Sequence, residues 1–203
     1  MNGRLVGKMK SVLLFSALLL MFGTGCGTQS PGSGTRNMTK EERDAKKKAE
    51  KETRAAEDKA WHEAAVQAIR ERSFVLEADR IEFKRGRFVY VTPSTNFVSL
   101  DKDRAVVQLA FNTGYAGPNG IGGITVDGLA SGVEVNTDKK GNVTIKMMVQ
   151  GSAISASVFI RMQAGSNQAT ATVTPNFNSN RISFSGTLYP TSESNVFKGR
   201  TLF

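Results

Sequence analysis

Residues 73–203 alternate between apolar and polar side chains, and this period of two is the feature that most constrains the fold. Successive side chains of a strand point to opposite faces, so such runs are typical of strands with one buried and one solvated face. The predicted buried faces hold Val143, Ile145, Met147 and Val149; Ile154, Ala156, Val158, Ile160 and Met162; Ala169, Ala171 and Val173; and Ile182, Phe184 and Leu188.

Short turn-forming segments separate these runs, at residues 85–86, 101–103, 138–141, 164–167 and 176–180. This spacing predicts about nine or ten short strands joined by hairpins, with no helical crossover between them. Segment 138–141 suits a type I turn that ends on a left-handed glycine. We therefore expect a mainly β domain over 73–203, either an antiparallel β-barrel or a β-sandwich, and the pattern does not separate the two.

Residues 39–72 contain neither glycine nor proline and consist mostly of Ala, Glu, Lys and Arg, which favour helix. Ten Lys and Arg nearly balance nine Asp and Glu in this segment. Alanine forms a thin apolar face along it, and Trp61, Val66 and Ile69 offer more substantial packing near its end. We expect a long charged helix that docks its last turns on the β domain, because a coiled coil needs larger core residues.

The first 25 residues are predicted to be a signal peptide. Three basic residues (Arg4, Lys8 and Lys10) precede an apolar run at 12–22, broken only by Ser16. That run is too short for a bilayer, which needs roughly twenty residues, and it matches the apolar region of a secretory signal.

Cys26 is the single cysteine of the chain, which excludes an internal disulfide and a metal cluster built on cysteines. The segment 23–26 resembles the lipobox of bacterial lipoproteins. That resemblance implies cleavage before Cys26, lipidation of its thiol, and acylation of the new amino group. Gly23 stands where an aliphatic residue is usual, so ordinary secretory cleavage nearby is the main alternative.

Residues 26–38 form the expected lipidated and flexible tether, since they are rich in Gly, Ser and Thr. Gly27 follows the cysteine in place of the aspartate that retains some lipoproteins at the inner membrane. We therefore expect an outer-membrane lipoprotein that faces the periplasm and reaches the membrane through Cys26.

The formal net charge of +9 does not indicate a nucleic-acid partner. Arg4, Lys8 and Lys10 belong to the predicted signal, and the basic residues of the β domain are scattered along the sequence. A nucleic-acid binder concentrates its positive charge on one face or stripe.

Residues 112–123 are rich in glycine and have no clear strand character. They do not form a phosphate-binding loop, because no Lys-Ser or Lys-Thr pair follows the glycines. One interpretation is a wide turn between two strands. The other is a loop that contacts a ligand or partner through Tyr115, Pro118, Asn119 and Ile121.

Several stretches of the β domain resemble a family of uncharacterised lipoproteins from Gram-negative anaerobes, catalogued as a domain of unknown function. They are 93–101, 105–128, 141–151, 173–188 and 196–200. The resemblance covers about residues 73–203 and implies a secreted, membrane-tethered β domain. It carries over no catalytic residue.

No catalytic, cofactor or metal motif stands out, and we expect a periplasmic binding or interaction module rather than an enzyme. A barrel with an apolar lumen would take a hydrophobic small molecule, and a sheet edge would take a periplasmic protein. His62 is expected to be an exposed helical side chain without a catalytic partner. The alternatives are a glycan hydrolase with paired carboxylates and a structural spacer between the outer membrane and the cell wall.

Overall fold

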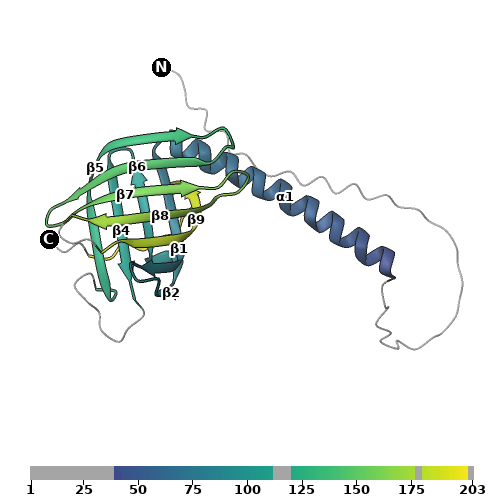
Figure 1. Cartoon of the computed structure of the whole chain (residues 1–203), viewed down its shortest axis with the longest axis horizontal. Coiled ribbons are helices and arrows are strands. Elements are labelled where there is room, and N and C mark those ends of the chain that lie inside the picture. The colour runs from purple at the N-terminus through teal and green to yellow at the C-terminus, as the bar shows by residue number, and fades with distance from the viewer. Residues whose placement is uncertain (1–38, 112–119, 177–179, 201–203) are drawn as a thin grey trace, which may run out of the picture. The chain divides into compact units, whose positions relative to one another are not determined.

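The computed structural model describes residues 39–111, 120–176 and 180–200, and it shows one long helix followed by antiparallel strands (Figure 1). The helix α1 spans Lys40–Arg70. The strands are β1 (Ser73–Phe83), β2 (Phe88–Tyr90), β3 (Phe97–Asp101), β4 (Arg104–Ala110), β5 (Gly123–Thr137), β6 (Val143–Gly151), β7 (Ser155–Met162), β8 (Gln168–Pro175) and β9 (Ile182–Pro190). Two 3-10 turns, η1 (Pro93–Thr95) and η2 (Thr191–Glu193), complete the described elements.

The strands form a closed barrel, which decides between the two architectures that the alternation allowed. From β3 to β9 each strand pairs with the next, and β9 returns to pair with β1. That closing pair runs from Phe74 opposite Pro190 to Phe83 opposite Ile182, with a register shift between Ala78 and Arg80. Eight strands therefore close the barrel, and β2 is an additional short strand beside β1.

Strands β2 and β3 lie along the same edge of β1, and η1 separates them. β2 pairs with the second half of β1, whereas β3 pairs with the first half. Asn96 is buried at the junction, where its carbonyl accepts from the N–H of Ala78 at 2.8 Å. Its side-chain oxygen accepts from the N–H of Ala110, also at 2.8 Å. Asn96 thus satisfies backbone donors of β1 and β4 where regular pairing is interrupted.

The predicted apolar faces line the interior of the barrel, except at Ile154, which is half-buried and lies just before β7. Ile145, Val149, Ile160 and Phe184 are each at most 1 % exposed, and all belong to one core cluster. The predicted turn also forms: Gly141 has φ +86° and donates its N–H to the carbonyl of Asp138 at 3.0 Å. The alternation therefore predicted the inward side correctly.

The last turns of α1 pack on the barrel, as the sequence indicated. Ala65, Ala68 and Ile69 are buried in the same cluster as the barrel interior. Trp61 meets Tyr189 of β9 edge-on, with 5.5 Å between ring centroids. Residues 40–60 are exposed, so the alanine face of the first part of α1 buries little.

The expectation that His62 is exposed was wrong. Its side chain is half-buried, and Nδ1 lies 2.9 Å from the carbonyl oxygen of Ser166 in the β7–β8 turn. The docking of α1 brings these residues together although they are 104 positions apart. Helical periodicity alone does not reveal such a contact.

The barrel has two distinct ends. At the helix end, α1 leads into β1. The turns that join β3 to β4, β5 to β6 and β7 to β8 lie at this end as well. At the opposite end, which we call the mouth, β1, β4, β6 and β8 finish and β5, β7 and β9 begin. The segment after η2, residues 194–200, runs over the outer face of β1, β3, β4 and β5, and we call it the strap.

No helix in the described ranges combines the length and the apolar character needed to cross a membrane.

Candidate functional site

The mouth of the barrel contains a cavity of about 750 Å3. Its apolar lining comes from Phe83, Ile124, Pro175 and Ile182. The register places all four on the interior face, since Phe83 is opposite Ile182 and Ile124 is opposite the buried Leu109. This volume lies within the roughly 300–1,000 Å3 typical of sites for small molecules.

Packed side chains lie beneath the cavity. The next interior positions are Ile81, Leu109 and Phe184, and they are between 0 and 9 % exposed. They belong to the cluster that continues to α1 at the other end. Side chains therefore fill the barrel below its mouth, the open space lies at the mouth itself, and the hydrophobic ligand expected from sequence stays a prediction.

Aromatic packing supports one wall of the cavity. The Phe83 ring lies 6.0 Å from the ring of Phe111, centroid to centroid, with 30° between their planes. Aromatic pairs at such distances contribute about 0.5–1.5 kcal/mol beyond the area they bury. Because Phe111 follows the last residue of β4, this contact joins β1 to the end of β4 beside the mouth.

Four basic residues also line the cavity: Lys84, Arg85, Arg87 and Arg181. The first three belong to the β1–β2 turn, which two hydrogen bonds close. Phe83 donates its N–H to the carbonyl of Arg87, and Gly86 donates to the carbonyl of Phe83, each at 2.8 Å. Gly86 has φ +76°, a conformation that glycine adopts without strain. The turn therefore places the backbone of these three basic residues at the rim.

The described lining contains no acidic side chain to offset this charge. Arg85, Arg87 and Arg181 are exposed and form no salt bridge with any of the residues that the structure describes. The site thus combines an apolar interior with a positively charged rim.

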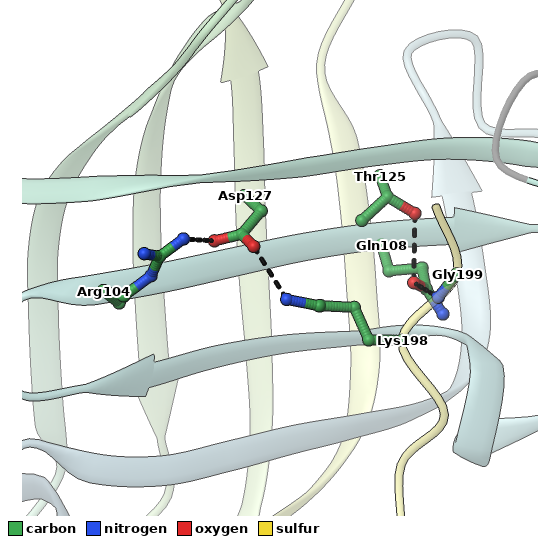
Figure 2. A network of polar contacts seen from close by, with 6 residues as sticks. All are labelled: Arg104, Gln108, Thr125, Asp127, Lys198 and Gly199. Carbon is green, nitrogen blue, oxygen red and sulfur yellow. Dashed lines mark hydrogen bonds and ion pairs between the residues drawn. The ribbon is translucent and has the colours of Figure 1, made fainter. Parts of the chain in front are cut away.

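The best-connected polar cluster lies elsewhere, between the outer face of the barrel and the strap (Figure 2). Gln108 is fully buried there. Its Nε2 donates to the carbonyls of Thr95 and Phe197, at 3.0 and 2.7 Å. Its Oε1 accepts from the hydroxyl of Thr125 at 3.0 Å and from the N–H of Gly199 at 2.8 Å. These four bonds satisfy the amide and fasten the strap to the barrel.

Asp127 forms the second part of this cluster, where Figure 2 shows its carboxylate between two cations. It accepts from Arg104 at 2.9 Å and from Lys198 of the strap at 2.8 Å. The Asp127 side chain is 7 % exposed, whereas Arg104 and Lys198 are 66 % and 52 % exposed. Burial raises the pKa of Asp127, but the hydrogen bonds and charges of the two cations outweigh it and lower that pKa below its ordinary value. The carboxylate therefore stays ionised and serves to hold the strap.

The residues predicted from sequence fall at several places. Cys26, Tyr115, Pro118 and Asn119 lie outside the described residues. Ile121 is described and half-buried before β5, but it does not line the cavity. Among the described residues, no group of three or more His, Cys, Asp or Glu side chains is placed to hold a metal ion.

Sequence reasoning missed both the cationic rim and the strap. Arg85 and Gly86 were interpreted only as a turn, although three basic residues lie within positions 84–87. Sequence reasoning made no prediction for Gln108, because nothing in the period shows that residues 194–200 return to cover it. One residue could have indicated the strap. Phe97 occupies an outward position of β3, and a large apolar side chain there indicates that another segment covers it; in the structure it is 1 % exposed.

Comparison with known proteins identifies the domain. A family model described as a domain of unknown function, DUF4251, matches residues 56–188. A crystal structure of a DUF4251 family protein from Bacteroides eggerthii DSM 20697 is 48 % identical, with a TM-score of 0.62. The match covers 72 % of this chain and 99 % of that one. No curated protein matches the chain. The resemblance to a domain of unknown function is confirmed, and the lipoprotein anchor stays a prediction.

Proposed function

This chain belongs to the DUF4251 family, whose domain has no known function, and from that premise we propose that it is a binding protein of the cell envelope. Its ligand is a small molecule with an apolar part, which occupies the mouth of the barrel. The observation that carries this proposal is the cavity of about 750 Å3 with Phe83, Ile124, Pro175 and Ile182 on its walls.

The exposure of Ile124 supports this proposal. Ile124 is 39 % exposed although its register places it on the interior face of β5. Burying the side chain of an isoleucine contributes about 1.5–3 kcal/mol. A ligand that covers this wall would gain part of that free energy, whereas the packed interior below has no comparable surface to offer.

The proposal also includes an anchor and a spacer. A lipidated Cys26 would hold the chain at the outer membrane, and residues 27–38 would form a flexible tether. The exposed part of α1, residues 40–60, is about 30 Å long at 1.5 Å per residue. This segment would hold the barrel away from the membrane. A chain that lacks residues 27–58 and keeps full function in cells would argue against the spacer.

Binding at the mouth is tested with the mature chain, residues 26–203, carrying Cys26→Ser to prevent acylation. The neutral dye Nile red is titrated and its fluorescence followed, and native mass spectrometry records any adduct. We expect saturable binding that Ile124→Trp abolishes, because the larger ring fills the mouth.

Leu129→Trp is the matched control, since Leu129 lies on the same strand, is 57 % exposed and points outward. It should leave the affinity for the dye unchanged. Equal loss of binding in both variants, or no binding by the unmodified barrel, would contradict a ligand site at the mouth.

A further inference from the structure

The rim of the cavity is positively charged, and a neutral apolar molecule would not interact with that charge. Lys84, Arg85, Arg87 and Arg181 line the same cavity as the four apolar walls. Three of them belong to one hydrogen-bonded turn, and Arg181 is the residue just before β9. Two segments that are distant in sequence thus bring positive charge to one opening.

We infer that the ligand is an anionic amphiphile, whose acidic head group binds the guanidinium groups of Arg85, Arg87 and Arg181 while its hydrocarbon chain lies against Phe83, Ile124 and Ile182. This inference rests on the proposed binding function and specifies the chemistry of the ligand. Carboxylate and phosphate heads share the required features, because both accept charge-assisted and bidentate hydrogen bonds from arginine.

The geometry favours this class over two simpler ones. A free inorganic anion would leave the apolar walls uncovered, and surface cations alone are well hydrated and bind weakly. A neutral hydrocarbon would cover the walls and leave the guanidinium groups facing only water. A molecule with one acidic end and one apolar end is complementary to both parts of the site at once.

The head group is tested with dodecanoate, dodecyl phosphate and dodecanol, each below its aggregation concentration, by competition with bound Nile red. We expect both acids to bind about tenfold or more tightly than the alcohol, since hydrogen bonds between charged groups contribute more than neutral ones. Comparable affinity for all three would overturn the inference and leave the proposed apolar site intact. If none of the three displaces the dye and the dye itself does not bind, the proposed function fails as well.

The role of the rim is tested with Arg85→Gln, Arg87→Gln and Arg181→Gln combined. This variant should lose about tenfold or more in affinity for dodecanoate and keep its affinity for dodecanol. The matched control combines Lys47→Gln, Lys48→Gln and Lys51→Gln, which remove the same charge from the exposed part of α1. Equal weakening by both triple variants would show that only the net charge matters and would overturn the assignment to the rim.

Two further experiments distinguish a bound amphiphile from a free anion and from a membrane surface. Inorganic phosphate should not displace dodecyl phosphate, and equal affinity for the two would show that the apolar walls take no part. Vesicles of phosphatidylglycerol should not sediment the barrel at physiological salt. Sedimentation with vesicles, without binding of monomeric dodecanoate, would identify the rim as a membrane contact and overturn the inference.

Discussion

Replacing Gln108 by leucine removes all four hydrogen bonds of the buried amide while nearly preserving its volume. The Gln108 side chain has no exposed surface. Its partners Thr125 and Gly199 are buried, whereas the bonds to Thr95 and Phe197 are only partly buried. The four partners belong to Thr95, Thr125, Phe197 and Gly199. The substitution therefore tests whether the strap depends on this one side chain.

The expected cost is about 2–4 kcal/mol, because a hydrogen bond contributes about 0.5–1.5 kcal/mol and a buried unsatisfied partner costs more. Detachment of the strap limits this cost in free energy. Once Gln108 no longer holds them, Phe197 and Gly199 regain water when the strap detaches. The two partners on the barrel, Thr95 and Thr125, lose their bonds to Gln108 whether or not the strap detaches.

Equilibrium unfolding in urea measures this difference in the free energy of unfolding. Trp61 is the single tryptophan, and its contact with Tyr189 makes its fluorescence a probe of the folded barrel. Hydrogen exchange at the amide of Gly199 reports separately on the strap and should become much faster in Gln108→Leu. Gln168→Leu is the control, since Gln168 is exposed on β8 and should change stability by at most about 0.5 kcal/mol.

A chain that ends at Ser194 completes the cycle. Without the strap, Gln108→Leu should cost about half as much, because two of the four partners are already absent. A cost below about 1 kcal/mol in the full chain, or the same cost with and without the strap, would refute the reasoning that Gln108 fastens the strap.

The remaining predictions concern other parts of the described structure. Gly186→Ala should lower the free energy of unfolding by about 3 kcal/mol or more, because a Cβ there would overlap the carbonyl oxygen of Glu77, a backbone atom that cannot move aside; a thermal midpoint equal to that of the unmodified chain would contradict this. Ile69→Ala should cost about 2–4 kcal/mol in urea unfolding by leaving a cavity between α1 and the barrel, and a cost below about 1 kcal/mol would show that the helix is not part of the core. Because the pKa of Asp127 is lowered in the folded chain, its ionised form stabilises the fold above its ordinary value of 3.8, and that stability is lost as pH falls through the lower folded value. Asp127→Asn should therefore cost about 1 kcal/mol at pH 7, and in acid unfolding curves the difference from the unmodified chain should shrink as pH falls below 3.8 and vanish only below the lower folded pKa; a difference that does not change with pH would contradict the ion pair.

The strand positions could be predicted from the sequence because burial on one face leaves a period of two. Val143, Ile145, Met147 and Val149 are at most 4 % exposed, as the alternation indicated. The helix could be predicted for a similar reason, since its composition favours helix along its whole length. Both are local properties of neighbouring residues.

The candidate site could not be predicted in the same way. Phe83, Ile124 and Ile182 are brought together only by the pairing of β1 with β9 and of β4 with β5. Arg181 joins Arg85 at the rim for the same reason. Nothing in the local pattern around any of these residues distinguishes an inward position at the mouth from one in the packed interior.

By itself the sequence determined which residues form strands, which side of most strands faces inward, and that a charged helix precedes them. Those outcomes depend on propensity and periodicity, which act over a few residues. Only the tertiary structure decided that β9 closes on β1 rather than leaving two packed sheets, that α1 covers one end, and that the strap buries Gln108. Each of these depends on contacts between residues that are far apart in the chain, and their free energy appears only when the whole barrel has assembled. The apolar mouth and its cationic rim exist for the same reason, because closure brings the ends of separate strands to one opening.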